Sequence, residues 1–379
     1  MSDSHPPTPA APRRPPTFWE RVTEGLELTQ IWRQFQSEAQ AGYGHYAKEV
    51  DWDDINQKTG LSRAFAIAKA FFLALLMRLS PARRVLLLLA IALLLFGEFS
   101  YVTGNVTTSL DFGALGVLGL FAVLALELAD RVTMKRDLEI AREIQRWLVP
   151  EAPPAIPGYE IAFATRPANT VAGDYYDVIT RPPTPQSSER WLLAVADVAG
   201  KSVPAALLMA TFQASLQTLS AASDSLEHLV DGVNRYACAH SLGGMRFTTA
   251  FLAELDPVSR TLTYVNAGHN APMLRRASGG VERLEVGGLP FGIESSAKFE
   301  SGSVQLQRGD CLLIFTDGLV EAVNSTEQEY SDPRLLSLVQ QMPLESATAT
   351  LQRVMFSVDV HVGTARQHDD TTAFVLRIL

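Results

Sequence analysis

The chain has 379 residues, of which 47% are hydrophobic and 19% charged, and its formal net charge is −9. This acidic balance, without a basic stripe in the C-terminal half, excludes a general attraction to nucleic acid, and we expect no nucleic-acid partner. The two cysteines, Cys238 and Cys311, lie far apart and lack CxxC spacing, which argues against a disulfide framework or a zinc site.

The first 84 residues precede the strongest apolar segments. Residues 1–17 are rich in proline, serine and threonine and cannot bury enough apolar surface to fold, so they predict a disordered tail. Residues 18–84 predict cytoplasmic or interfacial helices. Among them, the apolar segment 64–77 is short and interrupted by Lys69, so we expect it to lie at the membrane interface or to pack against the spans that follow.

Residues 85–128 predict a transmembrane hairpin built from two apolar segments, 85–102 and 112–128. Each carries one charge, Glu98 or Glu127, and a rise of about 1.5 Å per residue makes each just long enough to cross a hydrocarbon core of about 30 Å. The alternative is a pair of buried helices in a soluble domain. The unbroken apolar run 85–96 disfavours this alternative because it leaves no polar face.

Positive charges flank the outer ends of both apolar segments. They are Arg78, Arg83, Arg84, Arg131, Lys135 and Arg136. The positive-inside rule therefore places both flanks in the cytoplasm and leaves the short connection 103–109 outside. We expect a multi-pass protein of the inner membrane whose C-terminal domain is cytoplasmic.

Residues 129–150 predict a helical stalk with a coiled-coil seam. The seam residues recur at alternating spacings of 4 and 3 and are Met134, Leu138, Ala141, Gln145 and Leu148. Gln145 is expected to be a polar seam position that fixes the register. Such a stalk predicts a homodimer. The prolines from Pro150 to Pro157 end the helix and mark a domain boundary.

Residues 159–379 form the last predicted domain. Short β-rich runs and helical stretches come in groups here and do not alternate strictly. This order argues against a doubly wound parallel sheet and for an α+β layered fold.

Four acidic positions in this domain share one local setting, a glycine- or threonine-containing turn beside a strand-like run. They are Asp174, Asp197, Asp317 and Asp369, the last followed by Asp370. Any one of them is compatible with an ordinary turn. A carboxylate at the end of a buried strand is costly unless it is paired or binds a metal, and several together repel one another. A pair of divalent cations resolves this repulsion, and oxygen ligands suit Mg²⁺ or Mn²⁺.

Several short motifs in one order carry a family resemblance. They are VAGDYYD at 171–177, ADVAGKSVPAA at 196–206, NAGHN at 266–270, GLPFG at 288–292, TDGL at 316–319 and DDTT at 369–372. With these motifs, residues 159–379 resemble the metal-dependent PPM-type serine/threonine phosphatases, in particular their bacterial SpoIIE/RsbU branch. The resemblance implies an α/β/β/α sandwich and a hydrolase that acts on phosphoproteins.

The resemblance also implies roles for individual residues. Asp197 would bridge two divalent cations, Mn²⁺ or Mg²⁺. Asp174 and the backbone carbonyl of Val198 would bind one of them. The two cations would activate a water that attacks phosphorus in line, without a covalent enzyme intermediate.

The second cation would be bound by carboxylates from the C-terminal half of the domain. The resemblance assigns this role to Asp317 and Asp369, with Asp370 as the alternative to Asp369. Asp177 is expected to support these ligands. His269 and His368 are expected to be structural, and Arg166 to be a solvated surface residue rather than a phosphate contact.

The predicted function is that of a membrane-anchored protein serine/threonine phosphatase. By analogy with the branch, its substrate would be a phosphorylated anti-sigma-factor antagonist. The alternative is a weak or inactive signalling scaffold that keeps the fold. Its basis is that Ala172 and Ser202 stand where the branch usually has glycine, and Ala199 where the eukaryotic branch has a histidine.

Overall fold

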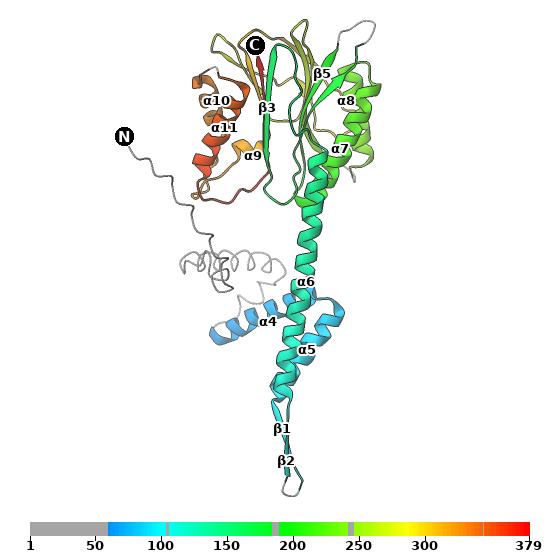
Figure 1. Cartoon of the computed structure of the whole chain (residues 1–379), viewed down its shortest axis with the longest axis vertical. Coiled ribbons are helices and arrows are strands. Elements are labelled where there is room, and N and C mark those ends of the chain that lie inside the picture. The colour runs from blue at the N-terminus through cyan, green and yellow to red at the C-terminus, as the bar shows by residue number, and fades with distance from the viewer. Residues whose placement is uncertain (1–59, 104–105, 184–188, 242–245, 344) are drawn as a thin grey trace, which may run out of the picture. The chain divides into compact units, whose positions relative to one another are not determined.

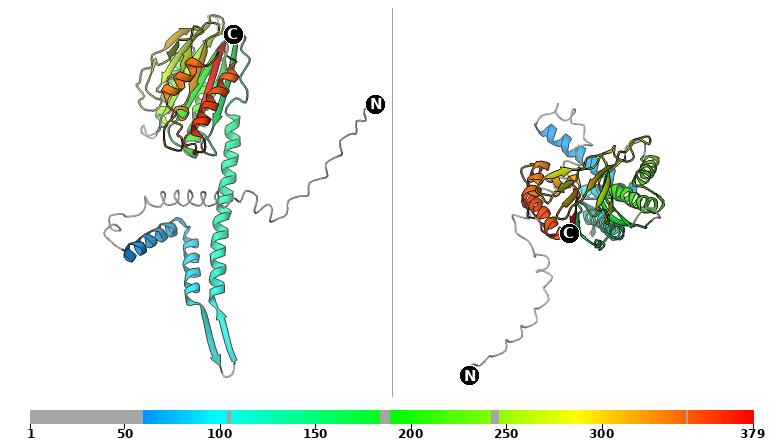
Figure 2. Two further views of the ribbon diagram at one scale, coloured as in Figure 1. Left: turned by 90° about the vertical axis from the view of Figure 1, so that its left-hand side faces the viewer. Right: turned by 90° about the horizontal axis from the view of Figure 1, so that it is seen from above.

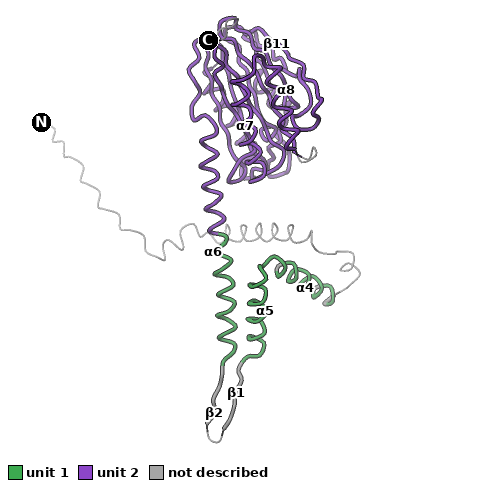
Figure 3. The backbone as a smooth tube through the Cα atoms, turned by 90° about the vertical axis from the view of Figure 1, so that its right-hand side faces the viewer, with its two compact units in different colours: residues 1–131 green, residues 132–379 purple. Residues whose placement is uncertain are grey.

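The structure is a computed structural model that describes residues 60–103, 106–183, 189–241, 246–343 and 345–379. The predicted tail at 1–17 and the amphipathic start of the 18–84 segment lie outside these ranges. The chain divides into two compact units, residues 1–131 and 132–379 (Figure 3). We describe each unit by itself.

The first unit consists of helices joined by a β-hairpin. Its elements are α4 (Gly60–Arg78), α5 (Pro81–Phe96), β1 (Glu98–Thr103), β2 (Val106–Asp111) and the start of α6 (Phe112–Trp147). The predicted segment 64–77 lies within α4. Among the described residues, α6 is the one helix that is long and apolar enough to cross a membrane by length and composition.

The prediction that 85–102 is one continuous apolar span is wrong in its last part. Helix α5 ends at Phe96, and Gly97 caps it with a positive φ of 62°. The following residues pair with β2 as an antiparallel ladder, so the connection predicted at 103–109 also belongs largely to a hairpin. Valine, threonine and tyrosine dominate this stretch, and these residues favour strands.

Helices α5 and α6 pack closely through small residues. A Cβ added at Gly116 would lie 2.7 Å from Cγ of Leu94 and 2.8 Å from the carbonyl oxygen of Ala90, and one at Gly119 would lie 2.9 Å from Cβ of Ala90. At the charged end of the pair, Arg83 contacts Glu127 and Asp130. The helices thus approach as small-residue helix pairs do in membranes.

The second unit contains two antiparallel-rich sheets. One sheet has the order β10-β7-β6-β5-β4 with β11 beside β7, and the other has the order β3-β13-β12-β8-β9. The strands are β3 (Tyr159–Arg166), β4 (Tyr175–Arg181), β5 (Arg190–Val198), β6 (Thr248–Asp256), β7 (Thr261–Ala267), β8 (Met273–Arg275), β9 (Val281–Arg283), β10 (Gly287–Gly288), β11 (Gly302–Gln305), β12 (Cys311–Phe315) and β13 (Thr371–Ile378). The helices are α7 (Ser202–Ala222), α8 (Leu226–Ala239), α9 (Asp317–Val320), α10 (Asp332–Gln341) and α11 (Ala347–Val362).

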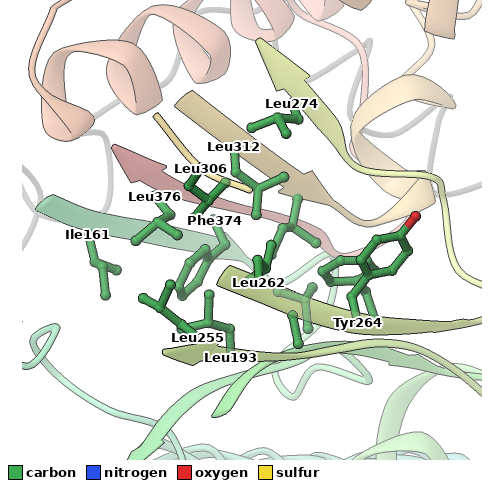
Figure 4. Close-up of a cluster of buried hydrophobic side chains, with 14 of the residues drawn as sticks. Ile161, Leu193, Leu255, Leu262, Tyr264, Leu274, Leu306, Leu312, Phe374 and Leu376 are labelled. Atoms are coloured by element: carbon green, nitrogen blue, oxygen red, sulfur yellow. The ribbon is translucent and has the colours of Figure 1, made fainter. Parts of the chain in front are cut away.

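The sheets stack face to face, with helices on both outer faces. Helices α7 and α8 cover one sheet, and α10 and α11 cover the other (Figures 1 and 2). Side chains from both sheets, among them Leu193, Leu312 and Phe374, fill the layer between them (Figure 4). The predicted α+β layered fold is confirmed.

The surroundings of strand β12 explain why its sequence is apolar throughout. Leu312 and Ile314 point into the layer between the sheets, whereas Cys311, Leu313 and Phe315 face the helices. A strand covered on both faces reads as a continuous apolar run. Cys311 is therefore a buried core residue, and burial raises the pKa of its thiol to about 11.

Candidate active site

The predicted acidic residues gather at one edge of the sandwich because paired strands end there together. Tyr175, which follows Asp174, pairs with Ala196, which precedes Asp197. In the other sheet, the end of β12 pairs with the start of β13, and the amide of Thr316 donates to the carbonyl of Thr372. This antiparallel pairing brings the turn with Asp317 beside the turn with Asp369 and Asp370.

Gly318 permits the close approach of these two turns. A Cβ at this position would lie 2.0 Å from the carbonyl oxygen of Asp370, so any larger residue would push the turns apart. Gly173 is also close to its neighbours, since a Cβ there would lie 3.3 Å from both Ala205 and the carbonyl of Val198.

The carboxylates lie near enough to perturb one another. Burial, and then the charges of Asp317 and Asp369, raise the pKa of Asp197 to about 7. Burial, and then Asp197, raise the pKa of Asp174 well above its ordinary value. Burial and Asp369 likewise raise the pKa of Asp317. The structure therefore brings Asp174, Asp197, Asp317 and Asp369 into one electrostatic cluster.

Asp370 has different partners from those of Asp369. Its two carboxylate oxygens accept backbone N–H bonds from Ala168 at 2.7 Å and Gly173 at 2.6 Å. Asp369 instead forms an ion pair with Nζ of Lys201 at 2.8 Å. Asp370 thus fixes the loop that leads to Asp174, and its charge, like that of Asp369, helps to raise the pKa values of Asp197 and Asp317.

Thr316 and Lys201 belong to this edge although sequence reasoning gave them no role. The hydroxyl of Thr316 donates to Asp174 at 2.9 Å and accepts from the amide of Thr372, which links the two sheets. Lys201 also donates to the carbonyl of His368 at 2.9 Å. The signals that could have found them are their positions, Thr316 directly before Asp317 and Lys201 in the glycine turn after Asp197.

Other residues singled out in the sequence lie elsewhere. The carboxylate of Asp177 accepts from the hydroxyl of Tyr175 and from Gln217 of α7, each at 2.6 Å, so it joins β4 to α7. Arg166 is not simply solvated, because it pairs with Asp359 of α11. His368 is exposed, and its carbonyl holds Lys201.

Gln145 is not the polar seam position that the heptad pattern predicts. Its side-chain amide donates to the carbonyl of Ala172 at 2.7 Å, and its oxygen accepts from the amide of Ala172 at 2.9 Å. The Gln145 side chain is therefore bonded within its own chain, to Ala172, which lies two residues before Asp174. Ala172 has no positive φ, which explains why alanine is accommodated, whereas Ser202 adopts a φ of 63°.

The donor set fits hard divalent cations, although the side chains are not arranged as a preformed site. Within the described ranges, no three acidic, histidine or cysteine side chains form a group that could hold a metal. Two of the carboxylates have protein partners, Lys201 for Asp369 and the Thr316 hydroxyl for Asp174. The raised pKa values nevertheless indicate crowded negative charge, which a cation bound by carboxylate oxygens would relieve.

Solved structures define the class to which this fold belongs. The SiaA-PP2C domain of Pseudomonas aeruginosa is 19% identical with a TM-score of 0.57, and the match covers 66% of this chain and 99% of that one. The PP2C phosphatase domain of SpoIIE from Bacillus subtilis, solved with a fragment of its regulatory domain, is 18% identical with a TM-score of 0.50, covering 58% and 63%. The two-sheet sandwich is therefore the PP2C, or PPM, phosphatase fold.

The family follows from the sequence. Residues 187–379 match the family Stage II sporulation protein E (SpoIIE), and the chain belongs to it. Phosphoserine phosphatase RsbU of Bacillus subtilis (strain 168) is 27% identical over 246 residues, which are 64% of this chain and 70% of RsbU. Phosphoserine phosphatase RsbP of the same strain is 24% identical over 254 residues, 65% of this chain but only 58% of RsbP. The chain is a protein phosphatase, a hydrolase.

Proposed function

We propose that this protein is a membrane-anchored, divalent-metal-dependent phosphatase that hydrolyses phosphoserine or phosphothreonine on a partner protein. The observation that carries the proposal is the carboxylate cluster at the sandwich edge, where the pKa of Asp197 is raised to about 7 by burial and by Asp317 and Asp369. A cluster of this kind is a candidate functional site because the crowding is costly without a ligand.

The metal ligands that we propose are divided between the two sheets. Asp197 would contact both cations, with Asp174 and the carbonyl of Val198 on one side and Asp317 and Asp369 on the other. Both carboxylates have partners on both oxygens. Asp369 is favoured over Asp370 because one of its oxygens is held by the exposed side chain of Lys201, whereas both oxygens of Asp370 are held by backbone amides.

When bound, a pair of Mg²⁺ or Mn²⁺ ions would supply a water nucleophile that is active at neutral pH and positive charge for the phosphoryl oxygens. The chain would supply the rest. Lys201 is exposed at the cluster and can donate to a phosphoryl oxygen once Asp369 is otherwise engaged. Ala199 offers no acid, so the leaving alkoxide oxygen would take its proton from water or from another side chain.

Membrane anchoring is supported by the first unit. Large apolar side chains of α6 face outward, with Leu118 64% and Phe121 67% exposed, while small residues pack α5 against α6. Together with the positive flanks, this arrangement supports a hairpin in the inner membrane and a cytoplasmic catalytic domain. Recovery of the full-length chain in the soluble fraction of lysed cells would overturn this part of the proposal.

A homodimer through the stalk is also proposed, but on a different face. Since Gln145 is used within the chain, exposed apolar side chains of the stalk, which include Val132, Met134, Ile140, Ile144 and Trp147, are the candidates for contact with a second copy. Sedimentation of the detergent-solubilised chain as a monomer would exclude this.

The substrate class follows from the relatives. RsbU and RsbP are named phosphoserine phosphatases. By analogy with their branch, we propose a phosphorylated anti-sigma-factor antagonist as the partner. A second candidate function, a weak or inactive scaffold, is favoured by one observation, the strained φ of 63° at Ser202 beside the cluster.

Hydrolysis of p-nitrophenyl phosphate by the detergent-solubilised full-length chain, with and without Mn²⁺, tests the central proposal. We expect Mn²⁺-dependent turnover, and we expect Asp197→Asn to lower it by at least about 100-fold because a bridging ligand is lost. The matched control is Asp231→Asn, which removes an exposed carboxylate on α8.

Two results would contradict the proposal. One is a metal-independent rate, and the other is an Asp197→Asn variant as active as the wild type. A wild type without Mn²⁺-dependent turnover would favour the scaffold.

A further inference from the structure

His269 is a buried polar residue next to the candidate site that the proposed mechanism does not use. It is 7% exposed, and burial lowers the pKa of its imidazole to about 4, so the ring is neutral at physiological pH. A neutral buried imidazole usually has hydrogen-bond partners for both nitrogens. The groups around this ring lead to both halves of the carboxylate cluster.

One ring nitrogen leads to Asp197. Nδ1 of His269 lies 3.1 Å from Oγ1 of Thr249, and this hydroxyl oxygen lies 3.4 Å from the backbone carbonyl oxygen of Asp197. Thr249 and Asp197 are also direct neighbours across β5 and β6. If Nε2 carries the single proton of the neutral ring, Nδ1 accepts from the Thr249 hydroxyl, which lies beside the Asp197 backbone carbonyl.

The other ring nitrogen leads toward Asp317. Nε2 is buried without a hydrogen bond in the described structure, and the backbone of Phe315 lies close enough to the ring to raise the pKa of the imidazole, so an Nε2–H group would have the Phe315 carbonyl as its acceptor. Phe315 is the last residue of β12, two positions before Asp317. The imidazole therefore stands between a strand of one sheet and a strand of the other.

The backbone of His269 is held firmly. Its amide donates to the side chain of Asn266 at 2.7 Å, and the preceding Gly268 has a φ of 67°. A Cβ at Gly268 would lie 2.5 Å from Cγ of Pro290. A residue can fix the distance between two strands only if its own backbone does not move, and these contacts hold the backbone of His269 in place.

We infer that His269, acting through Thr249, is a positioning residue that sets the spacing of Asp197 relative to Asp317 across the two sheets. This inference rests on the proposed metal-dependent function. It predicts that the imidazole and the Thr249 hydroxyl matter for divalent-metal affinity more than for folding, because groups that orient metal ligands control how well those ligands converge.

The test is calorimetric titration of Mn²⁺ into the metal-stripped full-length chain, with the thermal midpoint of the metal-free protein measured in parallel. His269→Ala and Thr249→Val should each weaken Mn²⁺ binding by about 10- to 100-fold, the range typical of residues that orient ligands. Thr249→Ser keeps the hydroxyl and should keep the wild-type affinity. The double variant should bind no more weakly than His269→Ala alone, because both changes break one chain of contacts.

The control and the contradicting results are separate from those of the central proposal. His240→Ala, at the exposed end of α8, should leave affinity unchanged. Unchanged Mn²⁺ affinity in Thr249→Val and His269→Ala, with only a lowered thermal midpoint, would show a purely structural role and overturn the inference. If His269→Ala fails to fold, Thr249→Val decides alone. A wild type that binds no Mn²⁺ would overturn the central proposal as well.

Discussion

The middle of the sandwich and its site edge are built from the same strands but by opposite rules. In the middle, Leu193, Leu312 and Phe374 are fully buried among apolar neighbours. At the edge, buried carboxylates raise one another's pKa. The apolar side chains of the middle pack against one another, whereas the carboxylates at the edge repel one another unless a ligand binds between them.

The apolar middle therefore stabilises the domain, whereas the carboxylate edge destabilises it when no ligand is bound. Strain and uncompensated charge persist only where the surrounding structure holds them in place. The position of Ser202 in the left-handed region, directly after Lys201, is a second cost at the same edge. The three predictions that follow change one region or the other.

The largest effect is expected in the middle. Leu312→Ala should lower the free energy of unfolding by about 2–5 kcal/mol, because it removes buried methyl groups and leaves a cavity. Leu207→Ala on α7, where the side chain is 64% exposed, is the matched control and should change it little. Chemical denaturation of both variants measures the difference, and equal losses would contradict a packed centre.

The second prediction concerns pH and the edge. The pKa of Asp197 is raised from 3.8 to about 7, so the folded, metal-free protein binds a proton that the unfolded chain has released. Stability should therefore be highest near pH 4 and fall as pH rises toward 7, with a slope of at most about 1.4 kcal/mol per pH unit for one proton. Asp197→Asn should flatten this slope.

Thermal unfolding of the metal-free protein between pH 4 and 7 measures the slope. Asp231→Asn, at an exposed position on α8, should retain the wild-type profile. A slope that Asp197→Asn leaves intact would show that protonation of Asp197 is not its source.

The smallest effect is expected at Ser202. Ser202→Gly should stabilise the domain by up to about 1 kcal/mol, because glycine adopts a positive φ without the Cβ clash. Ala214→Gly, at an exposed position inside the same helix α7, should have the opposite sign and cost about 1 kcal/mol. Thermal midpoints of the two variants separate these outcomes, and a destabilising Ser202→Gly would contradict the strain.

The middle was more predictable from sequence than the edge. The continuous apolar sequences of β5 and β12 are typical of strands covered on both faces. An aspartate directly after such a sequence is expected at the end of a strand. The α+β class followed from the grouping of these runs. The strands and the fold class could be predicted because both depend on hydrophobic patterns over short stretches of sequence.

Contacts between distant residues could not be predicted in the same way. The heptad spacing made Gln145 a seam residue, but its amide pairs with Ala172, which is 27 positions away. The apolar run before Glu98 predicts that the helix continues to Val102. In the structure the helix ends at Gly97, and the residues from Glu98 onward form a strand. His269 and Thr249 meet only because two strands bring them together.

The position of β13 in its sheet has a consequence for biosynthesis. β13 lies between β3 and β12, yet it follows every other described strand in chain order. A growing chain therefore presents β3 and β12 with unpaired edges until residues 371–378 have left the ribosome. Because Asp369 and Asp370 immediately precede this strand, a chain not yet synthesised past them cannot assemble the carboxylate cluster, and phosphatase activity would arise only after β13 has paired with β3 and β12.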